Sequence, residues 1–299
     1  MSTDPRTEFS STGLNFTPNT HSDTYPFIDP TKHNLSGKSA LVTGASKGIG
    51  RSTALSFARA GASNIAIAAR SSLSVVAEEI RKAAKAANRH IPNVLEIRLD
   101  VTDKDSVDDA RKLVSDKFGG KLDILISNAG SSEPWVPLVD SDPDNWWSSY
   151  TTNVKGQYLV TRAFLPLLFK SELKTIVGLS SIGANIIMPG GSAYQTAKLA
   201  LLRFMEFVNT EYGETGIVAY CVHPGGVDTE LARNMPENAH AFLVDTPELS
   251  GDSIVWLTSE RREWLRGRYV SCTWDMEQLL GKKEEIVKNE LLKVRLCVA

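Results

Sequence analysis

Tyr194 and Lys198 lie four residues apart in the segment Ser192–Leu202, whose pattern predicts a helix. At this spacing two side chains share one face of a helix. A tyrosine keeps its proton up to a pKa of about 10, so it transfers protons poorly at neutral pH unless a cation stabilises the phenolate. Lys198 is such a cation. The pair is a candidate for proton transfer, although a solvated helix face can also carry these two residues.

A glycine-rich turn, Thr43–Gly50, joins a short apolar run to a helical pattern. Glycine allows the backbone angles and the close approach that a pyrophosphate needs to reach the amides at the positive end of a helix. The spacing Gly-x-x-x-Gly-x-Gly differs from the general dinucleotide fingerprint, and a tight turn that merely requires glycine is the alternative. Its place in the first strand-helix unit favours cofactor binding. The expected cofactor contacts in this turn are Gly44, Ser46, Lys47, Gly48, Ile49 and Gly50.

Arg70 follows the second expected strand, where an acidic residue would bind the adenosine ribose of NAD. An arginine there suits the additional phosphate of NADP, and Lys47 in the glycine turn is a second cation near the same place. A solvated loop arginine is the alternative interpretation. The two cations together predict NADP as the cofactor.

Composition excludes several other classes of protein. The chain has 299 residues, 42% hydrophobic and 23% charged, with a net charge of −2 and no basic block, which argues against a nucleic-acid partner. No apolar run approaches the roughly 18 residues of a membrane span, and the polar N-terminus argues against secretion. Cys221, Cys272 and Cys297 are expected to be reduced thiols, and the scattered histidines predict no metal site. We therefore expect a cytoplasmic protein.

Short β-branched runs alternate with helical patterns from Ser39 onward, which is typical of a parallel sheet with crossover helices. The sequence predicts one α/β domain with a doubly wound (Rossmann) sheet of about seven parallel strands. The expected strands are 40–43, 65–69, 94–99, 122–127, 175–180, 217–222 and 269–271, and the expected helices are 49–60, 72–87, 104–117, 144–169, 194–212 and 251–258.

Two segments flank the dinucleotide-binding domain, which we place at residues 37–275. Residues 1–36 are rich in Ser, Thr, Asn, Asp and Pro and are expected to form an N-terminal arm whose end, Tyr25–Pro30, docks on the body. Residues 276–299 are expected to form a helical extension. Within it, Met276–Val294 reads as an amphipathic helix that packs on the body or at a subunit contact.

In order and spacing, the motifs of this chain resemble those of the short-chain dehydrogenase/reductase family. The matching motifs are Thr43-Gly-x-x-x-Gly-x-Gly50, Asp100-Val101, Asn128-Ala-Gly130, Asn153, Ser181, Tyr194-x-x-x-Lys198 and Pro224-Gly225. Each motif is weak alone, but together they span roughly residues 37 to 272. The resemblance implies an NADP(H)-dependent oxidoreductase that transfers a hydride between the nicotinamide and a carbonyl or secondary alcohol.

The resemblance also assigns residues to the cofactor. It implies Asp100 and Val101 at the adenine; Asn128, Ala129 and Gly130 bracing the sheet beside the cofactor; Pro224, Gly225 and Val227 near the nicotinamide, with Thr229 at its amide; and Lys198 on the nicotinamide ribose next to Tyr194.

Hydride transfer to a carbonyl builds negative charge on its oxygen. The site therefore needs a hydrogen-bond donor at that oxygen and a group that can give it a proton. Tyr194 is the expected proton source, with its pKa lowered by Lys198. Ser181 is expected to orient the carbonyl; Ser180 competes for this role, but strand alternation turns the two opposite ways and the family spacing favours Ser181. By resemblance, Asn153 holds a water that links Lys198 to solvent. The alternative is an interior asparagine bonded to a neighbouring carbonyl.

The segment 227–250 follows the sixth strand, at the edge of the sheet where loops carry ligand sites. Its apolar residues predict a lid over a bulky, mainly apolar carbonyl substrate. They are Met235, Pro236, Phe242, Leu243 and Val244. Trp135 and Met188-Pro189 are expected to form other walls, although Trp135 could be a loop anchor and Phe242 could pack against another subunit. If the substrate were instead a ketoacid, Arg233 would be the carboxylate clamp.

Other functions stay open. The same fold can serve as a dinucleotide-binding sensor or scaffold without chemistry, or as a non-redox dehydratase or epimerase. A serine hydrolase that pairs Ser181 with His223 lacks the Gly-x-Ser-x-Gly elbow. The family commonly pairs through the helices expected at 144–169 and 194–212, so we expect a homo-oligomer. The long arm and the ending Tyr269–Asp275, which lacks the family's Gly-Gly pair, look similar to fungal members, some of which act in secondary metabolism.

Overall fold

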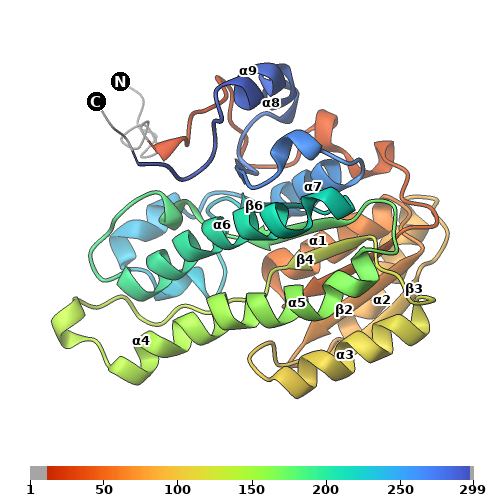
Figure 1. Cartoon of the computed structure of the whole chain (residues 1–299), viewed down its shortest axis with the longest axis horizontal. Coiled ribbons are helices and arrows are strands. Elements are labelled where there is room, and N and C mark those ends of the chain that lie inside the picture. The colour runs from red at the N-terminus through yellow and green to blue at the C-terminus, as the bar shows by residue number, and fades with distance from the viewer. Residues whose placement is uncertain (1–11, 297–299) are drawn as a thin grey trace.

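The computed structural model describes residues 12–296, and one parallel sheet lies at their centre (Figure 1). Its strands are β1 (Ser39–Thr43), β2 (Asn64–Ala69), β3 (Asn93–Arg98), β4 (Ile124–Ser127), β5 (Thr175–Leu179), β6 (Val218–His223) and β7 (Tyr269–Ser271). Their order is β3-β2-β1-β4-β5-β6-β7, and every pair is parallel. From β1 the strand order runs to one side through β2 and β3 and to the other side from β4 to β7, so it reverses between β1 and β4. Ligands bind at this reversal point in such sheets. The predicted doubly wound sheet is confirmed.

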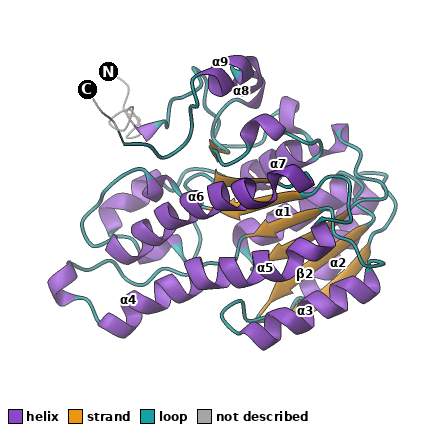
Figure 2. Cartoon of the chain, viewed as in Figure 1, coloured by secondary structure: helices purple, strands orange, loops and turns teal. Residues whose placement is uncertain are grey.

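Helices cover both faces of the sheet (Figure 2). On one face, α1 (Gly48–Arg59) contacts α2 (Ser74–Ala86) and α7 (Pro247–Thr258). On the other face lie α3 (Lys104–Lys117), α5 (Gln157–Leu168) and α6 (Ser192–Tyr212). Because both faces are covered, strand residues such as Leu41, Ile67 and Ile126 are fully buried, which explains the continuous apolar runs in the sequence.

The long helix expected at 144–169 is not a regular α-helix along its length. It consists of α4 (Pro143–Tyr150), a π-helical stretch (Thr151–Gly156) and α5. Asp142 begins it by accepting a hydrogen bond from the backbone of Asn145 at 2.8 Å. A π-helical turn inserts an extra residue per turn and is frequent at functional sites. Here it contains Asn153, one of the predicted site residues.

The prediction of a single helix over Met276–Val294 is wrong. The segment forms α8 (Met276–Gly281) and α9 (Lys283–Lys288), and then turns back with positive φ angles at Glu290 and Leu292. The two helices are separated at Lys282. The turn after α9 is held by the buried Arg268, whose guanidinium donates to the carbonyl of Leu291 at 3.1 Å and pairs with Glu290 at 3.2 Å. The returning chain also accepts a hydrogen bond from the Tyr269 amide, so it covers the edge of β7.

The arm packs against the segment that follows β7. The fully buried Trp274 donates from its indole nitrogen to the carbonyls of Gly13 at 2.8 Å and Leu14 at 3.2 Å. Thr20 forms an antiparallel bridge with Trp274, and His21 lies 2.9 Å from Asp275. The two features in which the chain departs from the family, the arm and its unusual ending, therefore support each other.

Candidate active site

A groove runs across the carboxyl ends of β1, β2 and β4, above the point where the strand order reverses. The predicted residues that line it are Gly44, Ser46, Lys47, Gly48, Ile49, Gly50, Arg70, Asp100, Val101, Asn128, Ala129, Gly130 and Thr229. Sequence reasoning missed several others, including Ser71, Thr102, Thr152, Asp228 and Glu230. The groove therefore brings together segments that are far apart in the chain, because each of them leaves a parallel strand at the same edge.

The glycine turn is shaped by sterics that only glycine satisfies. Gly44 and Gly48 have φ angles of +66° and +55°, in the left-handed region. A Cβ atom on Gly50 would lie 2.4 Å from the carbonyl oxygen of Gly44. The Asn128 side chain donates to the carbonyls of Thr43 at 2.7 Å and Gly44 at 3.2 Å, which ties the end of β4 to the turn. The turn therefore opens the first amides of α1 toward the groove.

The two predicted phosphate cations differ in their surroundings. Arg70 is exposed at the end of β2 and makes no hydrogen bond or ion pair with the described residues. The pKa of nearby Asp100 is lowered, chiefly by its hydrogen bond with the Thr102 hydroxyl, and Arg70 contributes to the shift. Lys47, in contrast, forms an exposed ion pair with Glu230 across the groove. Arg70 is thus the cation that is available to a ligand.

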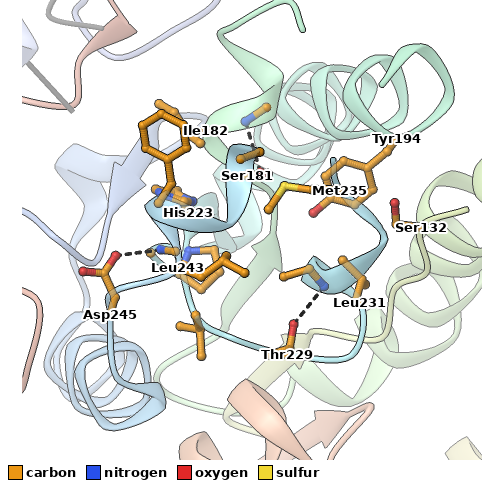
Figure 3. A pocket seen from close by; sticks show the side chains of 18 of the residues that line it. Ser132, Ser181, Ile182, Tyr194, His223, Thr229, Leu231, Met235, Leu243 and Asp245 are labelled. Atoms are coloured by element: carbon orange, nitrogen blue, oxygen red, sulfur yellow. Dashed lines mark hydrogen bonds between the residues drawn. The ribbon is translucent and has the colours of Figure 1, made fainter. Parts of the chain in front are cut away.

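A cavity of about 160 Å³ adjoins the groove, and the two share Ile49, Thr229 and Leu231 (Figure 3). Its lining is mostly apolar and includes the predicted Trp135, Met188, Val227, Met235, Phe242 and Leu243, together with Ile182, Ile186, Ala232 and Ala239. Pro189, Pro236 and Val244 are not part of the lining. Tyr194, Ser181, Pro224 and Gly225 line the cavity rather than the groove. An apolar ligand in this cavity would therefore reach both the tyrosine and the groove.

Tyr194 is partly buried, and its ring centroid lies 6.5 Å from that of Trp135. Burial raises its pKa to about 12; Glu133 raises it further, while a hydrogen bond with Ser181 lowers it. The hydroxyl therefore stays protonated throughout the neutral range. It holds the proton that a carbonyl oxygen would need, but the raised pKa makes it a weaker acid than a free tyrosine.

Lys198 is 3% exposed, and its ammonium donates to the carbonyl of Leu179 at 2.8 Å. Its nitrogen lies 5.4 Å from the centroid of the Tyr194 ring. Burial lowers the pKa of Lys198 to about 8. The expected lowering of the Tyr194 pKa by Lys198 is not observed, because burial of the phenol outweighs it and the ammonium lies over the ring.

Asn153 is fully buried below the groove. Its amide nitrogen donates to the carbonyls of Ser131 at 2.7 Å and Ser149 at 2.9 Å, as an interior asparagine bonded to its neighbours would. Its amide oxygen faces Gly130: a Cβ atom there would lie 2.8 Å from this oxygen and 3.4 Å from the Lys198 nitrogen. Neither Asn153 nor Lys198 lines the groove or the cavity. Both stand directly behind Gly130.

The neighbouring serines point in opposite directions. Ser180 donates its hydroxyl to the carbonyl of Lys198 at 3.0 Å, so it fixes the start of α6. Ser181 accepts a hydrogen bond from the Gly183 amide at 3.0 Å, and its side chain lies in the cavity near Tyr194 (Figure 3). Ser181 is thus the serine whose hydroxyl a ligand beside Tyr194 would meet.

Sequence reasoning missed six polar or distant residues of the cavity. They are Leu14, Ser132, Gln195, His223, Asp245 and Thr273. His223 ends β6, and burial lowers the pKa of its imidazole to about 3. Leu14 had no signal in the sequence, because only the path of the arm over Trp274 brings it to the cavity.

Other kinds of site are not found in residues 12–296. No group of three or more His, Cys, Asp or Glu side chains there could hold a metal ion. None of the helices in this range has the length and apolar character needed to span a membrane. Cys221 and Cys272 are buried free thiols, and burial raises the pKa of both. Cys297 lies outside the described residues.

Comparison with known proteins agrees with this geometry. A family model described as short chain dehydrogenase matches residues 38–240. The short chain dehydrogenase mpl6 of Monascus purpureus is 52% identical over 96% of this chain and 98% of its own length. A short-chain type dehydrogenase/reductase of Mycobacterium marinum superimposes with a TM-score of 0.70 at 29% identity, covering 82% of this chain and 97% of that one. A 3-ketoacyl-ACP reductase of Sinorhizobium meliloti gives a TM-score of 0.67 at 26% identity, with 81% and 99% covered. The chain therefore belongs to the short chain dehydrogenase family, a family of oxidoreductases.

Proposed function

We propose that this protein is an NADP(H)-dependent oxidoreductase that transfers a hydride between the nicotinamide and a carbonyl or secondary alcohol. One observation carries the proposal: Tyr194 and Ser181 lie in the wall of an apolar cavity that opens into the glycine-lined groove. A carbonyl placed there would have a proton donor and a hydroxyl at its oxygen. The similar 3-ketoacyl-ACP reductase supports the direction of carbonyl reduction.

The residues of the groove fit a dinucleotide. Glycine at positions 44 and 50 lets the turn pack against Asn128 and Ala129, which a Cβ atom would prevent, and both glycines line the groove. A pyrophosphate in the groove would therefore meet the first amides of α1. When bound, the nicotinamide supplies or accepts the hydride. Within the protein, Tyr194 gives the proton to the carbonyl oxygen and Ser181 orients that oxygen. Lys198 would hold the nicotinamide ribose, and Asn153 would hold a water that links Lys198 to solvent.

Arg70 directs the preference for NADP. It is exposed beside the groove without a partner among the described residues, whereas Lys47 is already paired with Glu230. Replacing Arg70 with aspartate is expected to weaken NADPH binding by roughly 1–3 kcal/mol and to spare NADH, because a negative charge would face the phosphate. Titration calorimetry with both cofactors measures this. Lys47→Ala is the matched control and should weaken NADPH less. Equal wild-type affinity for NADH and NADPH would overturn the assignment.

The substrate is bulky and mainly apolar. The cavity wall is built from apolar side chains, and the exposed Arg233 is paired with Asp228 through two hydrogen bonds of 2.9 and 3.0 Å, so it is not free to clamp a carboxylate. A fused-ring or long-chain ketone is expected to give a kcat/KM well above that of small charged ketoacids. Steady-state NADPH oxidation compares the two groups. Higher kcat/KM values for the ketoacids would exclude the apolar pocket.

We place the protein in the cytoplasm as a homo-oligomer. Apolar side chains are exposed on the helices through which the family commonly pairs: Trp147 on α4, Tyr158 on α5, and Leu199 and Phe207 on α6. Such a surface suits contact with a second copy of the chain.

A further inference from the structure

His223 stands out among the polar side chains of the cavity. It is 5% exposed, its Nδ1 atom is buried, and neither ring nitrogen has a hydrogen-bond partner within residues 12–296. An unpaired polar group inside an apolar cavity destabilises the protein unless a partner satisfies it. The ring is held in this position because its backbone is fixed between strands: the His223 carbonyl accepts from the Cys272 amide at 2.8 Å.

Most other polar groups of the cavity are already engaged, although the Gln195 amide nitrogen is buried without a partner among the described residues. Ser180, Ser181 and Thr229 bond to backbone groups at 3.0, 3.0 and 3.2 Å. The Asp245 carboxylate accepts a hydrogen bond from the Gly226 amide, and the Gln195 amide oxygen accepts one from the Met188 amide. The Thr273 hydroxyl is hydrogen-bonded to the Ser271 hydroxyl. Among the described lining residues, His223 and Gln195 each have a buried polar atom without a partner. The Gln195 amide nitrogen can only donate, whereas the His223 ring can both donate and accept.

His223 lies on the side of the cavity away from Tyr194, with Ser181 between them in the view of Figure 3. Figure 3 shows its ring near Ile182 and Asp245, on the opposite side of the view from Tyr194 and Ser132. Burial lowers the pKa of the imidazole to about 3, so the ring is neutral at ordinary pH and carries one donor and one acceptor nitrogen. A hydroxyl group, which both donates and accepts, is the matching partner.

We propose that His223 is a specificity-determining residue that hydrogen-bonds a hydroxyl on an otherwise apolar, ring-containing ketone, on the side of the cavity away from Tyr194. This inference rests on the proposed function, because the carbonyl must lie at Tyr194 for the hydroxyl to reach across the cavity. It narrows the substrate class from apolar ketones to hydroxylated polycyclic or aromatic ketones.

The test compares tetralone with its ring-hydroxylated isomers as substrates of the wild type, His223→Leu and His223→Gln. The wild type should favour at least one hydroxylated isomer over tetralone. His223→Leu should lower kcat/KM for that isomer by roughly 10- to 100-fold and leave tetralone within a few fold, because only the hydrogen bond is lost. His223→Gln should restore part of the preference. Tyr158→Phe, a change on exposed α5 outside the cavity lining, should preserve it.

A binding measurement separates this inference from the proposed function. Calorimetric titration of tetralone and the favoured isomer into the wild type and His223→Leu reports on the hydroxyl contact without turnover. If no ketone is reduced but the hydroxyl still strengthens binding only when His223 is present, the proposed function fails and the contact stands. If no isomer is favoured in either assay, or if the preference survives His223→Leu, the inference is wrong.

Discussion

Replacing Tyr194 with phenylalanine is expected to lower kcat for ketone reduction by about 10²- to 10⁴-fold, the usual contribution of a general acid. Only the proton-bearing oxygen is removed, and Tyr194 does not line the groove, so NADPH affinity should stay close to that of the wild type. Stopped-flow NADPH oxidation measures the rate, and fluorescence titration measures cofactor binding. Because the pKa of Tyr194 is raised to about 12, the wild-type rate should not fall between pH 7 and 9 through loss of this proton.

The matched control is Tyr158→Phe, the same change on an exposed tyrosine of α5, which should leave both rate and cofactor affinity unchanged. Near wild-type turnover in Tyr194→Phe would remove the tyrosine from the reaction. Loss of NADPH binding in the same variant would mean that its ring, rather than its hydroxyl, holds the site together.

Replacing Lys198 with methionine should abolish most activity and stabilise the fold at neutral pH. Burial lowers the pKa of Lys198 from 10.5 to about 8, so at pH 7 the folded protein holds a charge that the unfolded chain solvates better. This penalty is on the order of 3 kcal/mol, less the contribution of the hydrogen bond to Leu179. Urea unfolding of both proteins measures the difference.

The difference in the free energy of unfolding between the wild type and Lys198→Met should depend on pH in a definite direction. Between about pH 8 and 10.5 the unfolded chain binds more protons at Lys198 than the folded protein does, so wild-type stability rises with pH relative to Lys198→Met. The advantage of the variant should therefore shrink through this window and disappear above it. Tyr194 titrates above this window and is present in both proteins. A constant difference from pH 7 to 10.5 would mean that Lys198 is not buried as a charge.

The sheet was predictable because its strands are buried on both faces and read as short apolar runs. The ends of those strands carry motif residues such as Asn128, Ser181 and Pro224, and parallel strands bring their carboxyl ends to one edge. Many residues that line the groove could therefore be named: those of the glycine turn and Arg70 from the sequence pattern, and the others from the resemblance to the family. Sequence reasoning also identified Trp135 and Met235 in the cavity, because they follow strands that end at this edge.

What could not be predicted depends on contacts between distant side chains. The ion pair of Lys47 with Glu230 joins two loops whose relative distance the sequence does not reveal. The buried Arg268 holds the turn that follows α9, and the path of the arm brings Leu14 to the cavity. The direction of the Tyr194 pKa shift is a balance between burial and a nearby cation. The sequence motif identifies Tyr194 and Lys198 but does not indicate how deeply either side chain is buried.

The most direct test of the account follows the hydride itself. Wild-type protein is incubated with a fused-ring ketone and NADPH that carries deuterium at the transferable position of the nicotinamide, and the product is examined by mass spectrometry and NMR. We expect an alcohol with one deuterium on the carbinol carbon and an equal amount of NADP⁺. A bound but unchanged cofactor, or a product formed without deuterium, would contradict the account and indicate a sensor or a non-redox enzyme.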